Sequence, residues 1–181
     1  MFKNFVESAK KLKETRVLCA CAVLIAVYAV LYALPIQLST ELRITFTFIP
    51  IAISGWLFGP VPAMLVGGIS DVISSAFLFP KGPYFPGFTV TAILSGLVFG
   101  LFLYKRKTVS GVIFSRTIIN LFLNIVLNSF WLSILYKKGF IFYLISHFFK
   151  NILLLPIEIT LLIIILKIMT THGIKKMYKS Q

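Results

Sequence analysis

Long apolar runs separated by short polar segments constrain this chain more than any other feature of its sequence. Six such runs cover residues 17–34, 44–58, 61–79, 87–104, 112–136 and 142–169. A helix needs roughly 20 mostly apolar residues to cross the hydrocarbon core of a bilayer. Proline and glycine, which break helices, stand at almost every boundary between the runs. The sequence therefore predicts an all-α integral membrane protein, a bundle of six transmembrane helices forming a single domain over residues 1–181.

Composition supports a membrane location and excludes several other classes of protein. Only 13% of the 181 residues are charged, and the mean hydropathy is +0.97. A soluble domain carries roughly 25% charged residues, so this chain has too few polar side chains to cover a surface exposed to water. Basic domains that bind nucleic acid gather their charges on one wetted face, whereas these charges lie between apolar runs. We therefore expect the lipid bilayer as a partner and no nucleic acid.

The second run, residues 44–58, is short for a membrane span and contains Pro50. From Arg43 to Phe48, charged or hydroxyl residues alternate with apolar ones, which indicates an extended lid better than a helix. Lipid cannot satisfy the backbone groups of an irregular segment. We therefore expect other parts of the protein to shield this region.

The net charge of +13 predicts how the bundle is oriented. Lys and Arg accumulate in the loops on the cytoplasmic side of a membrane. With six spans, twelve of the 18 basic residues fall on the side that holds both chain ends, and four fall on the other side. We therefore predict cytoplasmic termini, with a basic N-terminal segment at residues 1–16 and a basic tail at 171–181. The two remaining basic residues, Arg116 and Lys150, lie within apolar runs.

Few residues in this chain could support catalysis or bind a metal ion. Asp71 is the only aspartate, and the sequence contains neither a phosphate-binding Gly-x-x-x-x-Gly-Lys loop nor a Gly-x-Ser-x-Gly motif. Cys19 and Cys21 are two residues apart, so they do not face each other on a helix. We therefore expect that the chain is not an enzyme, has no metal site and uses no cofactor.

A polar stripe follows the fifth apolar run, because Arg116, Asn120, Asn124 and Asn128 recur every four residues. On a helix this spacing forms one slowly winding face. Buried amides and an arginine need partners in a membrane, and two interpretations remain open. The stripe either lines a ligand cavity or bonds neighbouring helices, with Arg116 paired to Asp71 or Glu158.

The sixth run and the loop before the fourth run add further candidates. Lys150 either faces a ligand or extends to the membrane surface, and Glu158 either pairs with Arg116 or serves a ligand. The loop at residues 79–88 contains three prolines, two glycines and several aromatic rings beside Lys81. Such a loop suits a flat, anionic heteroaromatic ligand, although aromatic residues also form belts at membrane interfaces.

Small residues follow one face of the first run, at Ala22, Ala26, Ala29 and Ala33. Steps of four, three and four residues keep these side chains on a single helical face. Small residues let another helix approach closely, either from a partner protein or from within the bundle. Gly96 and Gly100 have the same spacing, and there packing within the bundle is the favoured interpretation.

These motifs resemble those of the substrate-binding S components of energy-coupling factor (ECF) transporters, most closely the folate-specific FolT family. The resemblance extends over essentially the whole chain. The segment Phe79-Pro-Lys-Gly-Pro-Tyr-Phe-Pro-Gly-Phe-Thr89 resembles a motif of the folate-specific members, and residues 128–136 resemble the end of their fifth helix. Residues 43–50 are similar to the opening of the second helix in S components generally. The alanine face resembles the surface by which S components contact their transmembrane partner.

The resemblance implies a folate-binding subunit of an ATP-driven vitamin importer in a bacterial plasma membrane. Such a subunit captures folate outside and releases it inside by tipping against the coupling subunit EcfT, while the ATPases EcfA and EcfA' hydrolyse ATP. The alternatives are an S component for riboflavin, thiamine or pantothenate, or a membrane scaffold that binds no vitamin. A scaffold would depend mainly on the alanine face for its function.

The resemblance and the residue chemistry together define the candidate site. The pterin ring of folate could stack on aromatic side chains and bond to the amides, and its carboxylates would favour cations. Arg116 lies near the cytoplasmic end of its helix, which weakens its claim on a ligand that enters from outside. The substrate-binding candidates are Arg43, Phe46, Lys81, Tyr84, Phe85, Arg116, Asn120, Asn124, Asn128, Trp131 and Lys150. The partner-interface candidates are Ala22, Ala26, Ala29 and Ala33.

Overall fold

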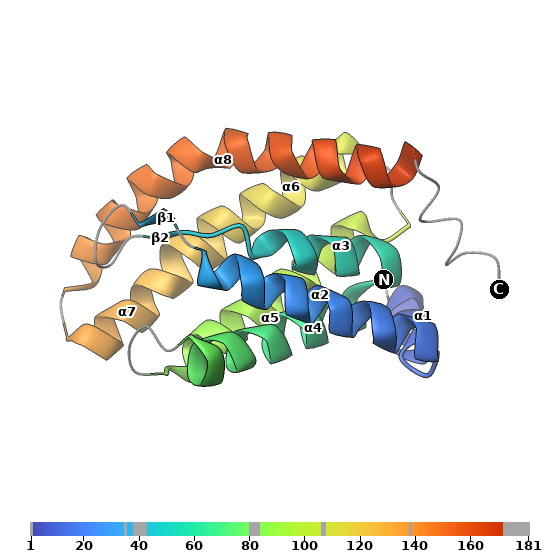
Figure 1. Ribbon diagram of the computed structural model, residues 1–181. Helices are drawn as coiled ribbons and strands as arrows, with labels where there is room; N and C mark the ends of the chain where they lie inside the picture. The colour runs from blue at the N-terminus through green and yellow to red at the C-terminus, as the bar shows by residue number, and fades with distance from the viewer. Residues whose placement is uncertain are drawn as a thin grey trace.

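Helices account for most of the chain, and they pack side by side as a bundle (Figure 1). The computed structural model describes residues 2–34, 36–37, 43–79, 84–105, 108–137 and 139–171. In chain order the elements are α1 (Phe2–Lys11), α2 (Thr15–Ala33), β1 (Ile36–Gln37), β2 (Arg43–Ile44), α3 (Phe48–Phe58), α4 (Pro60–Val72), η1 (Ile73–Leu78), α5 (Pro86–Leu103), α6 (Val109–Ile118), η2 (Ile119–Leu127), α7 (Asn128–Tyr136) and α8 (Phe140–Thr171). The two η segments are π-helical and continue α4 and α6 without a break.

Five helical segments are long and apolar enough to cross a membrane. They are Thr15–Ala33, Pro60–Leu78, Pro86–Leu103, Val109–Tyr136 and Phe140–Thr171. These segments confirm the prediction of an all-α integral membrane protein. Helix α3 has only 11 residues, and at 1.5 Å per residue it extends about 16 Å, roughly half the thickness of the hydrocarbon core. The second run thus forms a helix shorter than a full span, and the number of membrane crossings stays a prediction.

Helix α3 lies inside the bundle, where the protein shields it and the non-helical segment before it from lipid. Nine of its 11 residues are buried, and it packs against α2, α4, α5 and α8. The predicted helix at residues 44–58 begins only at Phe48, because Arg43–Ile44 pairs as an antiparallel strand with Ile36–Gln37. The extended segment expected from the alternating pattern is thus present over its first residues. Pro50 falls in the first turn of α3, where its missing N–H breaks no helical hydrogen bond.

Helices α4 and α5 make the closest packing in the bundle, and glycines permit it. A Cβ atom added to Gly100 would overlap the backbone of Pro60, and one added to Gly96 would overlap the backbone of Ala63. The two glycines therefore serve contacts within the bundle, the interpretation that the sequence favoured. The contact holds α4 and α5 as one rigid wall of the site described below.

The basic N-terminal segment, predicted only as a cytoplasmic flank of the first span, contains helix α1. It packs against α4, and the Ser8 hydroxyl accepts a hydrogen bond of 3.0 Å from the backbone N–H of Val61. Lys105 Nζ lies 2.6 Å from Glu7 Oε2, and this hydrogen bond lowers the pKa of Glu7. Helix α1 lies at the same end of the bundle as the last turns of α8 (Figure 1), which is the end predicted to face the cytoplasm.

Candidate functional site

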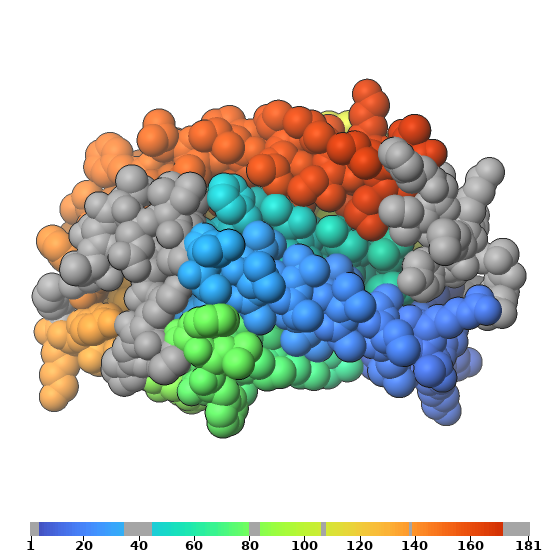
Figure 2. Space-filling view, viewed as in Figure 1, coloured from blue at the N-terminus to red at the C-terminus, as the bar shows by residue number. Residues whose placement is uncertain are grey.

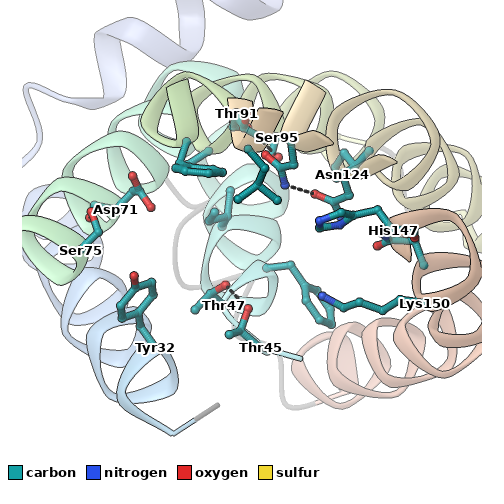
Figure 3. Close-up of a pocket in the computed structure, with 18 of the residues that line it drawn as sticks. Tyr32, Thr45, Thr47, Asp71, Ser75, Thr91, Ser95, Asn124, His147 and Lys150 are labelled. Carbon is teal, nitrogen blue, oxygen red and sulfur yellow. Dashed lines mark hydrogen bonds between the residues drawn. The ribbon is translucent and has the colours of Figure 1, made fainter. Parts of the chain in front are cut away.

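A cavity of about 350 Å³ opens within the bundle toward the end opposite α1. Its volume falls in the range of about 300–1,000 Å³ typical of small-molecule sites. Residues from α2, α3, α4, η1, α5, α6, η2, α7 and α8 line it, so the cavity depends on the whole arrangement of helices. Figure 3 shows hydroxyl, amide and charged side chains directed inward from these walls.

The inner part of the cavity contains a buried ion pair between α6 and α8. Arg116 Nη2 lies 2.7 Å from Glu158 Oε1, and Arg116 Nε donates to Glu158 Oε2 over 3.1 Å. The guanidinium also lies 4.0 Å from the centre of the Phe48 ring, which is favourable for a cation over an aromatic face. Of the alternatives left open by the sequence, the structure therefore contains the pairing of Arg116 with Glu158.

The three asparagines continue from this ion pair as a directional chain of hydrogen bonds. Asn120 Nδ2 donates to Glu158 Oε2 over 2.8 Å, and Asn124 Nδ2 donates to Asn120 Oδ1 over 2.7 Å. Asn128 Nδ2 then makes a long contact of 3.5 Å with Asn124 Oδ1. An ionised carboxylate only accepts hydrogen bonds, so Glu158 determines which way each amide points. Within the described chain, Asn128 Oδ1 ends the series with no partner.

The polar stripe stays on one face because the helix changes type along it. Four residues exceed one turn of an α-helix, which has 3.6 residues per turn, but fall short of one turn in the wider π-helix. Asn120 and Asn124 lie in η2, whereas Arg116 precedes it and Asn128 follows it. A step of four residues therefore rotates the side chain slightly past its starting face in the α-helix and slightly short of it in the π-helix. The two rotations oppose each other, so the stripe remains aligned along the cavity.

Aromatic rings form the wall near the start of α5, next to α7. Tyr84 and Phe85 line the cavity. Trp131 lies behind Phe85, with ring centres 5.7 Å apart, and its Nε1 donates to Thr91 Oγ1 over 3.2 Å. The indole therefore fixes the position of the Phe85 ring and ties α7 to α5.

Two further ionisable side chains line the cavity from opposite walls. Lys150 on α8 extends into the cavity, and Asp71 at the end of α4 lies on the far side (Figure 3). The sequence suggested Asp71 only as a partner for Arg116, which pairs with Glu158 instead. A lone carboxylate within an apolar run was the signal that could have identified Asp71 as a site residue.

The structure sorts the predicted substrate-binding residues into three groups. Those that line the cavity are Tyr84, Phe85, Arg116, Asn124, Asn128 and Lys150. Asn120 and Trp131 lie behind them and act through hydrogen bonds and ring contacts. Phe46 packs against Phe48, with ring centres 6.4 Å apart, and against the hydrophobic core. The side chain of Arg43 and all of Lys81 lie outside the described residues.

Several cavity residues were missing from the sequence-based set. They are hydroxyl, imidazole and amide side chains, among them Tyr28, Tyr32, Thr45, Thr47, Ser75, Thr91, Ser95, His147 and Asn151. Most of them form pairs four residues apart, a spacing that places both members on one helical face: Tyr28 and Tyr32, Thr91 and Ser95, and His147 and Asn151. Thr45 and Thr47 belong to the alternating segment before α3, so these spacings were signals that could have identified the residues. In the part of the chain that the structure describes, no three His, Cys, Asp or Glu side chains cluster closely enough to hold a metal ion.

The alanine face lies on the outside of the bundle. Helix α2 runs along the face of the molecule shown in Figure 2. Ala22 and Ala26 are exposed on this helix, and Ala29 and Ala33 are half-buried. A smooth, accessible strip of this kind can accept a closely packed helix from another protein.

Comparison with known proteins identifies relatives over most of the chain. Residues 16–166 match the family described as "ECF transporter, substrate-specific component". A protein of Clostridium novyi named folate transporter FolT is 40% identical over 118 residues, which cover 65% of this chain and 68% of that protein. A folate transporter FolT of Leuconostoc mesenteroides is 31% identical over 153 residues, covering 81% of this chain and 82% of that one.

A solved structure shares the fold. The crystal structure of FolT bound with folic acid superposes with a TM-score of 0.74 at 34% sequence identity, covering 82% of this chain and 90% of that chain. The family model spans far more than half of this chain, and its members are binding subunits of transporters rather than enzymes. The chain therefore belongs to the family of substrate-specific components of ECF transporters, as a multi-pass membrane protein of a bacterial transport system.

Proposed function

We propose that this chain is the folate-binding subunit of an ECF importer in a bacterial plasma membrane, with its cavity open to the outside when it captures the vitamin. The observation that carries the proposal is the cavity of about 350 Å³, whose walls combine aromatic rings, amides and a cation. It occurs in a fold shared with FolT bound with folic acid.

The chemistry of the walls suits the parts of folic acid. The flat pterin ring can stack on Tyr84 or Phe85, and its ring nitrogens and carbonyl can bond to Asn124 and Asn128. The glutamate carboxylates need a cation, and Lys150 extends into the cavity. Arg116 is engaged in two contacts with Glu158, so we assign the ligand carboxylates to Lys150 instead.

Binding to the purified protein tests this proposal directly. Isothermal titration of the protein in detergent with folic acid should give saturable binding at one molecule per chain. Riboflavin, thiamine and pantothenate added in excess should not displace it. Tight binding of one of these vitamins, with none of folic acid, would assign the chain to a sister family. Absence of binding to all four would favour a scaffold.

Members of this family work with a transmembrane coupling subunit and ATPases in general. We propose that Ala22, Ala26, Ala29 and Ala33 of this chain contact the coupling subunit EcfT, and that EcfA and EcfA' hydrolyse the ATP. The exposed position of Ala22 and Ala26 on α2 supports this assignment. Tipping of the bundle against EcfT would then turn the cavity toward the cytoplasm, and this chain itself would use no cofactor.

A further inference from the structure

Asp71 is a buried carboxylate for which the described residues provide no cation. Its side chain lines the cavity and only 6% of the residue is exposed. Among the described residues, Glu7 pairs with Lys105 and Glu158 pairs with Arg116, whereas Asp71 forms no such ion pair. A charged group at this depth in a membrane protein is costly unless hydrogen-bond donors surround it. The carboxylate of Asp71 therefore needs hydrogen-bond donors, and a ligand bound in the cavity can supply them.

The local hydrogen bonds leave much of this carboxylate available to a ligand. Thr89 Oγ1 donates to Asp71 Oδ2 over 2.8 Å, and this uses the only proton of the hydroxyl. Tyr84 must therefore be the donor in its 2.8 Å contact with Thr89. The Ser75 hydroxyl donates to the backbone oxygen of Asp71 over 2.6 Å, not to the carboxylate. A carboxylate has about four acceptor sites, and the hydrogen bonds above fill one of them.

The opposite wall carries the opposite charge. Figure 3 shows Asp71 on the α4 side of the cavity and Lys150 on the α8 side. A ligand that matches this arrangement presents N–H donors at one end and an anionic group at the other. Folic acid has both features, since its pterin carries a ring N–H beside an exocyclic amino group and its glutamate carries two carboxylates.

We propose that Asp71 determines specificity for the pterin by binding its aminopyrimidine edge. This inference rests on the proposed function, folate binding. The two carboxylate oxygens accept hydrogen bonds from the ring N3–H and from the 2-amino group. These two N–H groups are adjacent and parallel, like the two donors by which a guanidinium holds a carboxylate in a bidentate pair. The hydrogen bonds from Tyr84 to Thr89 and from Thr89 to Asp71 hold the carboxylate in an orientation that faces the ligand. The glutamate end of folic acid then lies toward Lys150.

Titration of each of two ligands into each of two proteins tests the contact between Asp71 and the aminopyrimidine edge. The ligands are folic acid and 2-desamino-2-methylfolic acid, which lacks the amino donor. The proteins are the unaltered chain and D71N, which keeps the size of the side chain but replaces one acceptor by a donor. The unaltered protein should bind folic acid about ten to a hundred times more tightly than the analogue. D71N should lose most of that preference, because it weakens folic acid binding far more than analogue binding.

A matched control removes a hydroxyl away from the cavity. Ser133 on α7 donates to the backbone oxygen of Phe130, so S133A should leave both affinities unchanged. Thermal unfolding of each variant in detergent shows whether it folds.

Three outcomes would count against the inference, and each has a different meaning. Equal affinity of the unaltered protein for the two ligands overturns it, whether or not D71N folds. A loss in D71N that is the same for both ligands assigns Asp71 a structural role and also overturns it, while leaving folate binding in place. Failure of the unaltered protein to bind folic acid overturns the proposed function itself, and the inference with it.

Discussion

Arg116 and Glu158 bury opposite charges within hydrogen-bond distance, with 2.7 Å between Nη2 and Oε1, and only 3% of Arg116 is exposed. Removing one partner leaves an uncompensated charge in a dry environment, which typically costs about 3–5 kcal/mol. We therefore expect E158L to lower the stability of the protein by about this amount. Thermal unfolding in detergent measures the loss.

The double variant R116M/E158M serves as the control for the ion pair. It removes both charges and fills the space with apolar side chains, which is often close to neutral for buried pairs. The double variant should therefore unfold at a higher temperature than E158L alone. A double variant that is as unstable as the sum of the single changes would show that the pair does not act as a unit.

Asn128 ends the amide chain with an unpartnered oxygen, so its contribution should appear in ligand binding. Asn128→Leu should weaken the binding of folic acid by about 1–3 kcal/mol if a ligand donor is left unpaired in the cavity. Titration calorimetry measures the change. Thr160→Val, which removes an exposed hydroxyl on α8, is the matched control. Unchanged affinity in Asn128→Leu would show that this end of the stripe is structural.

The sequence predicted that the residues of this polar stripe share one helical face, but it did not predict which of them line the cavity. A spacing of four residues placed the amides on one face, because that follows from helix geometry alone. It could not distinguish Asn120, which lies behind the cavity, from Asn124, which lines it. That difference depends on how η2 is rotated against α8, and many contacts across the bundle decide the rotation. The role of Asp71 was missed because the sequence does not show that Arg116 meets Glu158 and not Asp71.

Helix α2 presents its alanines outward, so the effect of larger side chains should fall on assembly rather than on binding. The variant A22F/A26F should keep its affinity for folic acid, because neither alanine is among the cavity residues, but lose folate uptake in cells that contain the partner subunits. Uptake of labelled folate and titration of the purified variant measure the two properties separately.

The control for α2 places the same bulk elsewhere on the helix. Val23 and Val30 are exposed at 62% and 60%, and their positions lie about a quarter turn from the alanine face. V23F/V30F should leave uptake close to normal. Equal loss of uptake in both double variants would mean that the alanine face has no special role in assembly.

Helix α3 is shorter than the apolar run that predicted it. Its sequence is as apolar as a membrane span, so hydropathy predicted a sixth crossing. The alternating pattern before it was read correctly as extended, and strand pairing shortens the helix to 11 residues. Burial by four neighbouring helices lets a short helix end within the bundle, and that burial is a property of the assembly.

The orientation of the whole molecule is a prediction from the distribution of its basic residues. In a cysteine-free background made by C19A and C21A, a membrane-impermeant thiol reagent should label G139C on intact cells. It should label K13C only after the cells are opened. Gly139 has open space around an added Cβ atom, and Lys13 is exposed, so both substitutions should be tolerated. The reverse labelling pattern would place the termini outside.

The sequence by itself determined that the chain is a helical membrane protein, because the length and hydropathy of each run are local properties. The spacing of small and polar residues likewise predicted an alanine face and a polar stripe before any packing was known. Only the tertiary structure decided that α3 is short and enclosed, that Arg116 is paired with Glu158, and that Asp71 and Lys150 face one cavity. These features join residues that are far apart in the chain, and the relative rotation and depth of packed helices determine which of them meet.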